Sequence, residues 1–280
     1  MNTKVTENYA KIKPILLLIP ISILVGMAVL LFTNGNLSTL GYVEFQQESF
    51  FTLNAKLSQF PALEYNLTQL GDAFIALSLL SIFISYAPKI WEALLTGSSL
   101  SLLFSKGLKE FFDIPRPVTI FGEEQVHIIG ETLVGYSSLP SGHSITIFTT
   151  LTVLMYAFVG SLHKSPMVRN LAVLGLVAVG FFVALSRVGV GAHHPLDVLT
   201  GCCLGYTSAV LGIWITNRYP IFKWVGHKNA RPFFALLFIG SLAFLGKKIA
   251  KENLMIYYFP LISLLASLYL IVKSYVKKVH

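Results

Sequence analysis

The sequence predicts an all-α, polytopic transmembrane helix bundle of about eight spans. Two observations lead to this class. The 280 residues are 54% hydrophobic and only 12% charged, about half the charged share of an average soluble domain. The hydrophobic residues also gather in runs of about 20, the length that crosses a hydrocarbon core about 30 Å thick. No polar linker separates two apolar halves, so we expect one membrane domain.

Eight segments have the length and character of membrane spans. They are residues 14–33, 68–87, 90–112, 143–162, 168–186, 196–216, 232–249 and 254–273. The first resembles a secretory signal, but it is long for a signal core, and Asn34-Gly35-Asn36 follows it where a cleavage site would stand. We therefore expect it to remain as the first membrane helix. Between the first two spans, residues 34–67 are mixed in character, and one interpretation is a short amphipathic helix on the membrane surface.

The basic residues predict the orientation of the spans. With a cytoplasmic N-terminus, 13 Lys and Arg residues, Lys164, Lys277 and Lys278 among them, lie inside and 8 lie outside. The prediction is a multi-pass protein of the plasma (inner) membrane. Lys247, Lys248 and Lys251 run against the rule, because it places them outside. The same rule explains the net charge of +8 without nucleic acid as a partner.

Cys202 and Cys203 are adjacent in an apolar run. Neighbours on a helix do not readily form a disulfide, so we expect both to be packing residues. The sequence shows no set of residues with metal-ligand spacing, and it predicts no metal and no cofactor.

The first of three polar clusters ends the third span. Pro115 and Pro117 do not continue a helix, so that span is predicted to end near Asp113. Lys109 then lies about one turn inside the end and Arg116 just beyond it. Two cations so placed are suited to hold one anion, although a basic pair facing lipid headgroups is an equal alternative.

The second cluster is Pro140-Ser141-Gly142-His143, which immediately precedes an apolar run. Ser141 is a candidate N-cap, and Gly142 lets the backbone approach a ligand. The free N–H groups at a helix N-terminus attract anions. His143 has a side chain suited to proton transfer, although a histidine at a helix start is more often structural.

The third cluster runs from Ser186-Arg187 to His193-His194-Pro195-Leu196-Asp197. Pro195 suits the first turn of the sixth span, which places Asp197 in that turn. His193 precedes Asp197 by four residues, close enough for the carboxylate to fix its tautomer and leave the other ring nitrogen free to attack. A capped helix start with a headgroup-facing Arg187 is the alternative.

The predicted topology places all three clusters on one membrane face. The first ends span three, the second opens span four, and the third joins spans five and six. Three cations, two histidines and an aspartate on one face predict a site for a phosphate ester. Independent structural explanations of each cluster do not predict this convergence.

Three spaced motifs resemble the signatures of the type 2 phosphatidic acid phosphatase (PAP2) superfamily: Lys-x6-Arg-Pro, Pro-Ser-Gly-His and Ser-Arg-x5-His-x3-Asp. They correspond here to Lys109–Pro117, Pro140–His143 and Ser186–Asp197. The resemblance covers residues 70–216. It implies a six-helix core, residues 1–220, with residues 221–280 as an added C-terminal transmembrane hairpin in the same membrane domain.

The resemblance also implies a metal-independent mechanism with a phosphohistidine intermediate. His193 is the implied nucleophile, Asp197 its orienting partner and His143 the general acid and base. The implied phosphate-binding residues are Lys109, Arg116, Ser141, Gly142 and Arg187. His194 matches no catalytic position, and it is left as a neighbour able to touch substrate. The loop of residues 118–139 is expected either to cover the lipid or to select its headgroup.

The function predicted is an integral membrane lipid phosphatase with its site on the periplasmic or extracellular side. Its partners are the bilayer and a phosphorylated lipid. The candidates are undecaprenyl pyrophosphate, phosphatidylglycerol phosphate, phosphatidic acid and lipid A phosphate, with a weak preference for the pyrophosphate. Two alternatives stay open: a lipid-to-lipid phosphotransferase, and a non-catalytic protein that binds or transports lipid phosphates. The sequence leaves the oligomeric state open.

Overall fold

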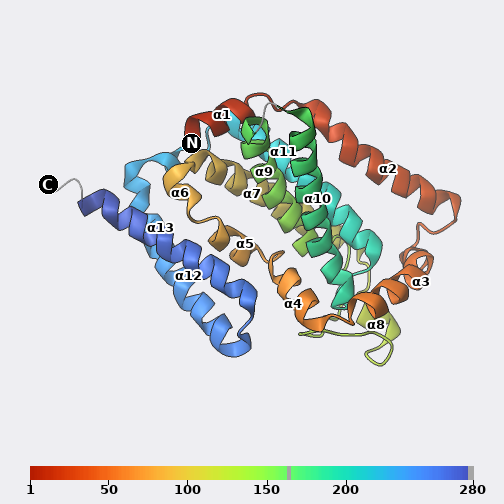
Figure 1. Cartoon of the computed structure of the whole chain (residues 1–280). Helices are drawn as coiled ribbons and strands as arrows, with labels where there is room; N and C mark the ends of the chain where they lie inside the picture. The colour runs from red at the N-terminus through yellow and green to blue at the C-terminus, as the bar shows by residue number, and fades with distance from the viewer. Residues whose placement is uncertain (163–164, 277–280) are drawn as a thin grey trace.

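The computed structural model describes residues 1–162 and 165–276, and they form an all-helical bundle (Figure 1). Lys164, Lys277 and Lys278 of the orientation count lie outside the described residues. The α-helices are α1 (Asn2–Tyr9), α2 (Leu18–Thr33), α3 (Thr39–Leu57), α4 (Pro61–Gln69), α5 (Ala73–Leu79), α6 (Phe83–Tyr86), α7 (Pro88–Phe112), α8 (Pro117–Phe121), α9 (Gly142–Leu162), α10 (Pro166–Gly189), α11 (Pro195–Arg218), α12 (Arg231–Glu252) and α13 (Tyr258–Val276). Short 3-10 turns lie at Pro14–Leu17, Lys223–Gly226, Lys228–Ala230 and Met255–Tyr257.

Helix α11 is the centre of the bundle and packs against α7, α9 and α10. In the apolar stretch of α11, 67% of the residues are buried, whereas in the segment Pro14–Thr33, which contains α2, the buried share is 11%. Glycines let the neighbouring backbones come close to α11. A Cβ at Gly201 would lie 2.7 Å from the Ser141 carbonyl, and one at Gly205 would collide with the Ile145 carbonyl. Backbone approach through small residues is how membrane helices pack without a hydrophobic driving force.

Six helical segments in the described chain have the length and hydropathy to cross a membrane. They are Pro14–Thr33, Gly142–Gly160, Pro166–Gly189, Pro195–Arg218, Lys228–Glu252 and Met255–Ser274. The polytopic all-α class is therefore confirmed, while two of the eight predicted spans differ. Helix α7 has 25 residues and is long enough, but it is outside this set, because its charged residues, serines and glycines lower its hydropathy.

The predicted continuous span of residues 68–87 is wrong, because this segment contains the short helices α5 and α6 with a turn between them. The carbonyls freed by the turn are bonded by side chains from elsewhere. Trp91 Nε1 donates to the Leu80 carbonyl at 2.8 Å, and Ser263 Oγ donates to the Leu79 carbonyl at 2.7 Å. Irregular backbone at membrane depth is tolerated where protein groups satisfy it in this way.

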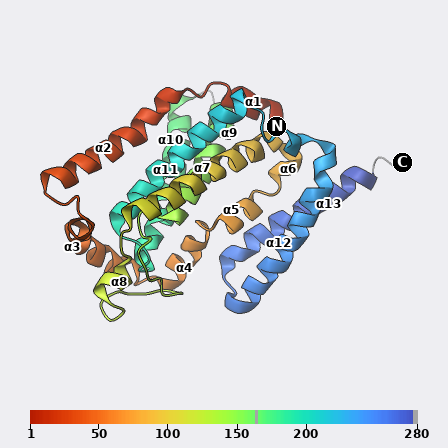
Figure 2. The same ribbon diagram turned by 180° about the vertical axis from the view of Figure 1, so that it is seen from behind.

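The C-terminal hairpin of α12 and α13 packs beside this broken segment (Figures 1 and 2). Ser81, in the turn, shares hydrogen bonds with Ser263 Oγ at 3.1 Å and Ser267 Oγ at 2.9 Å. The buried ring of Trp91 packs edge-on with Phe234 of α12, with 5.7 Å between the ring centroids. The hairpin is thus joined to the rest of the chain by both polar and apolar contacts.

Residues 34–67 hold two helices in place of the single short surface helix suggested by the sequence. Helix α3 has 19 residues and α4 has nine. Ser38 caps α3 by accepting a hydrogen bond from Gly41 N at 3.1 Å. Both helices lie with α8 at the lower end of the bundle in Figure 1, and buried residues of α3 reach the start of α11.

Candidate active site

The three polar clusters meet at the end of the bundle where α7 and α10 finish and α9 and α11 begin (Figures 1 and 2). Proline chemistry fixes two of these ends. Helix α7 stops at Phe112, and Asp113 turns the chain with a left-handed φ of 45° ahead of Pro115. Helix α11 starts at Pro195, as predicted, so Asp197 stands in its first turn.

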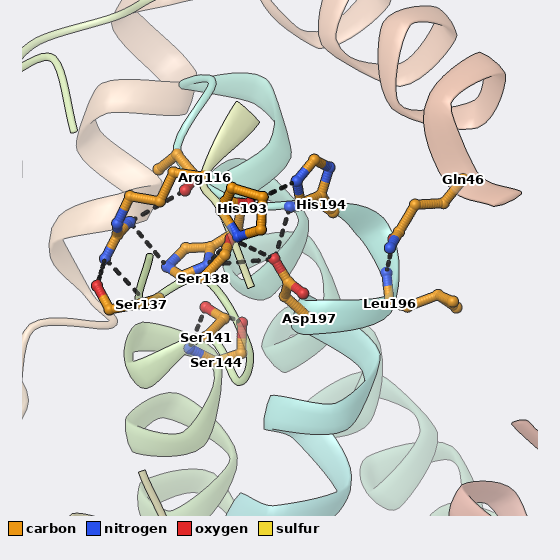
Figure 3. Close-up of polar contacts among 12 residues, drawn as sticks. Gln46, Arg116, Ser137, Ser138, Ser141, Ser144, His193, His194, Leu196 and Asp197 are labelled. Atoms are coloured by element: carbon orange, nitrogen blue, oxygen red, sulfur yellow. Dashed lines mark hydrogen bonds and ion pairs between the residues drawn. The ribbon is translucent and has the colours of Figure 1, made fainter. Parts of the chain in front are cut away.

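The carboxylate of Asp197 is fully buried and accepts three hydrogen bonds; Figure 3 draws those from Ser138 and His194. Tyr42 Oη donates to Oδ1 at 2.8 Å, and Ser138 Oγ donates to Oδ2 at 2.6 Å. The backbone N–H of His194 also donates to Oδ2, at 2.9 Å. These donors hold a buried negative charge in one orientation.

The imidazole of His193 faces Asp197 through Nδ1, which lies 3.6 Å from Asp197 Oδ2 and 3.5 Å from Ser138 Oγ. Its Nε2 lies on the other side, 3.5 Å from Arg116 Nη1. The side chain is 2% exposed, and burial lowers the pKa of His193 to about 3, with the charges of Arg116 and Arg187 acting in the same direction and Asp197 opposing. A neutral imidazole keeps a lone pair on one ring nitrogen, which a nucleophilic histidine needs.

Arg116 is held by backbone oxygens on two sides. Its Nη1 donates to the Ala192 carbonyl at 3.0 Å, and its Nη2 lies 3.5 Å from the carbonyl and hydroxyl of Ser137. Lys109, one turn before the end of α7, lies within electrostatic range of Arg116, Arg187 and Asp197. Of the pair predicted from the first cluster, Arg116 approaches His193 Nε2 directly.

Arg187 is buried near the end of α10 and has a free donor. Its Nη1 donates to Thr68 Oγ1 at 2.7 Å, while its Nε has no hydrogen-bond partner in the described part of the chain. Arg187 and His143 line one cavity of about 230 Å³, together with Thr68, Asp72, Glu131 and Lys248. A buried cation with an unused donor at a cavity wall is suited to bind an anion.

His143 stands at the first turn of α9, where the link between α4 and α5 passes close to it. A Cβ at Gly71 would lie 2.7 Å from the Cβ of His143. Besides the cavity shared with Arg187, His143 and Gly142 line a second cavity of about 280 Å³, which continues along Ser98, Ser101 and Ser105 of α7.

Ser141 is fully buried, and its contacts are with protein groups. Its backbone N–H donates to the Asp197 carbonyl at 3.1 Å, and its hydroxyl accepts from Ser144 Oγ at 2.8 Å. It therefore ties the start of α9 to the first turn of α11. Its neighbour Gly142 reaches the cavity wall, and Ser141 does not.

His194 does not lie where the sequence left it, near substrate. It is 0% exposed, its Nε2 lies 3.1 Å from the Pro115 carbonyl, and its ring packs against Phe50 and Phe121. The backbone of His194 is extended, and the side chains of His193 and His194 point in different directions (Figure 3). Of these two histidines, His193 is the one that lies next to Arg116.

Sequence reasoning missed Tyr42, Gln46 and Ser138. Gln46 Oε1 accepts the N–H of Leu196 at 2.8 Å, and Gln46 Nε2 donates to the Tyr42 carbonyl at 2.9 Å. Burial and the Asp197 carboxylate raise the pKa of Tyr42 well above its usual value, so the hydroxyl remains a donor. Ser138 belongs to the segment of residues 118–139, whose last residues run beside His193 and Asp197. No motif marks these positions, since each is remote in sequence from its partner.

Cys202 and Cys203 are free and buried, and Cys202 packs with Val198, Val183 and Ile147. Across residues 1–162 and 165–276, no cluster of three or more His, Cys, Asp or Glu side chains is arranged to hold a metal ion.

Comparison with known proteins adds a family match. Residues 90–221 match the model of the PAP2 superfamily. The chain is 27% identical to phosphatidylglycerophosphatase B of Haemophilus influenzae over 196 residues, 55% of this chain and 80% of that protein. It is 35% identical to an undecaprenyl-diphosphatase of Sulfolobus acidocaldarius over 86 residues, 31% of this chain and 37% of that protein.

Among solved structures, Aquifex aeolicus LpxE aligns with a TM-score of 0.48 and 24% identity, covering 61% of this chain and 95% of LpxE. The family match spans all three clusters from Lys109 to Asp197.

Proposed function

We propose, from the match of residues 90–221 to the PAP2 superfamily model, that this chain is a member of that superfamily and an integral membrane lipid phosphatase that works through a phosphohistidine at His193. The substrate class is a lipid phosphomonoester or pyrophosphate. The observation that carries the proposal is the orientation of His193: a buried, neutral imidazole with Nδ1 toward Asp197 and Nε2 toward Arg116. The relatives named phosphatidylglycerophosphatase and undecaprenyl-diphosphatase support the activity of a lipid phosphatase.

In the first step, the lone pair of His193 Nε2 attacks phosphorus. The bond from phosphorus to the leaving oxygen breaks, and that oxygen takes a proton from the protonated form of His143. The ring of His193 becomes positively charged when phosphorylated, and the carboxylate of Asp197 stabilises this charge across 3.6 Å.

In the second step, His143 acts as a base. It takes a proton from a water molecule that attacks the phosphorus, and the phosphorus–nitrogen bond breaks with its electron pair returning to Nε2. Inorganic phosphate leaves, and both histidines return to their starting states. The two steps use the same residue, His143, to donate and then to recover one proton, and His143 lines the cavity.

The charge on the phosphoryl oxygens is met by cations from three elements. Lys109 comes from α7, Arg116 from the turn before α8, and Arg187 from α10. The free Nε of Arg187 and the N–H groups at the start of α9 are further donors. Fixed donors aimed at developing charge supply most of the catalysis in phosphoryl transfer.

The basic residues favour a cytoplasmic N-terminus, which puts the site on the outer face of the plasma membrane. The N-terminus and the start of α12 lie at the end of the bundle opposite the site (Figure 1). The proposed substrates are accordingly lipids exposed on the outer leaflet.

The test is phosphate release from detergent-solubilised protein in EDTA. The panel holds undecaprenyl pyrophosphate, phosphatidylglycerol phosphate, phosphatidic acid and lipid A. Wild type is expected to release phosphate and His193→Ala to be inactive, with His227→Ala as a matched control because His227 is exposed and distant from the site. Activity in His193→Ala would refute the nucleophile, and strict dependence on a divalent ion would refute the metal-independent mechanism.

A further inference from the structure

The C-terminal hairpin reaches the candidate active site, although its sequence contains no motif that predicts this. Its tip lies at the same end of the bundle as α4 and α8 in both views (Figures 1 and 2). Asn66 Oδ1 of α4 accepts the N–H of Ile256 at 3.1 Å. Lys251 also contacts Glu131 of the 118–139 segment, with Nζ 3.4 Å from Oε1. The hairpin is thereby fastened to two segments that border the cavity.

Lys248 lies one turn before Lys251 on α12, and it is part of the cavity wall that also holds Arg187 and His143. It lies within electrostatic range of His143. The ring of Tyr257 lies 5.5 Å from its Nζ, a cation–π contact that helps to orient the side chain. The adjacent Lys247 is exposed and does not line the cavity.

The charge of Lys248 has no carboxylate partner in the described part of the chain. The two acidic residues of the cavity wall are engaged elsewhere: Asp72 caps α5 through Ile75 N at 3.1 Å, and Glu131 faces Lys251. Arg187 likewise has no acidic partner. Two cations, Arg187 and Lys248, therefore line this cavity together with His143, and neither forms an ion pair with a carboxylate among the described residues.

We infer that Lys248 forms a second phosphate subsite, which binds a phosphate carried by the leaving group of a lipid diphosphate. The inference rests on the proposed function, in which His143 protonates the leaving oxygen. The group next to His143 is therefore the leaving group, and a cation there favours a leaving group that is itself a phosphate. A lipid monophosphate such as phosphatidic acid leaves a neutral alcohol and gives Lys248 nothing to bind.

The experiment compares Lys248→Met with Lys247→Met in the full-length protein, using farnesyl diphosphate and dioleoyl phosphatidic acid as substrates. Lys248→Met is expected to raise KM for the diphosphate about tenfold, the loss of one charge-assisted hydrogen bond, and to change KM for phosphatidic acid less than about twofold. Lys247→Met should leave both near wild type. Lys248→Arg should restore most of the diphosphate affinity, because it keeps the charge.

A binding measurement separates this inference from the proposed function. Equilibrium binding of farnesyl diphosphate to His193→Ala protein, with and without Lys248→Met, reads the subsite without turnover. About tenfold weaker binding in the double variant would support the subsite even if no lipid is hydrolysed. Equal losses for the diphosphate and phosphatidic acid, or no loss for either, would overturn it.

Discussion

The hydroxyl of Tyr42 donates a 2.8 Å hydrogen bond to Asp197 Oδ1, joining α3 to the first turn of α11 across 155 positions of sequence. Ser138 and the His194 backbone N–H bind the other oxygen. Tyr42 touches neither cavity that His143 lines, so it is a positioning residue. It orients the carboxylate that faces His193, and it does so from a segment with no recognisable motif.

Tyr42→Phe is expected to lower kcat about tenfold and to leave KM within about twofold. The buried carboxylate loses one of three donors, a cost of about 1–3 kcal/mol in stability or orientation, while the phosphate-binding side chains keep their places. Steady-state kinetics on the best lipid of the panel measure the split. Tyr86→Phe, an exposed residue on α6, is the control. A change in KM alone, or none at all, would show that Tyr42 does not act through Asp197.

The positions that sequence predicted correctly are those governed by local chemistry. Pro115 and Pro117 predicted the end of α7, and Pro195 predicted the start of α11, since proline restricts its own backbone and that of the preceding residue. The apolar runs predicted the polytopic class for the same reason, because length and hydropathy are properties of a segment by itself.

The features that sequence missed depend on contacts between distant segments. The break between α5 and α6 is stabilised by Trp91 and by Ser263 of α13, and hydropathy along residues 68–87 contains no trace of either. One local signal was available, because Asp72 followed by an apolar run is a common N-cap pattern. The donors to Asp197 and the position of Lys248 had no such signal, since only the fold brings them to the site.

Protein stability is expected to fall as pH drops from about 7 to 5. Burial first, and the charges of Arg116 and Arg187 second, lower the pKa of His193 to about 3 in the folded protein, against about 6.5 in the unfolded chain. Between these values only the unfolded chain binds the proton, so the free energy of unfolding decreases as pH falls through this window. At pH 5 this proton uptake by His193 in the unfolded chain lowers the free energy of unfolding by about 2 kcal/mol.

Thermal unfolding in detergent at pH 7.0, 6.0 and 5.0 checks this. His193→Gln should flatten part of the decline in Tm, because the substituted residue does not titrate, whereas His227→Gln should follow the wild-type slope. Burial also lowers the pKa of His194. The Tm of His193→Gln is therefore still expected to decline in part as the pH falls. Identical slopes in His193→Gln and wild type would mean that folding does not lower the pKa of His193.

The close approach of α9 to α11 gives a prediction about Gly201. A Cβ there would lie 2.7 Å from both the Ser141 carbonyl and the Ser144 Cβ, closer than real Cβ contacts. Gly201→Ala therefore has to push the start of α9 away from α11. The Ser141 N–H bond to the Asp197 carbonyl crosses this same contact, so the shift moves His143 relative to His193.

We expect Gly201→Ala to lower Tm by several degrees, as overpacking costs about 1–3 kcal/mol, and to lower kcat more than Tm alone explains. Gly240→Ala is the matched control: it lies inside α12, a Cβ there would meet nothing within 4 Å, and alanine is the better helix former. Its Tm should be equal to wild type or slightly higher. If both variants behave alike, the α9–α11 contact is looser than 2.7 Å implies, and the two histidines are not held in register by it.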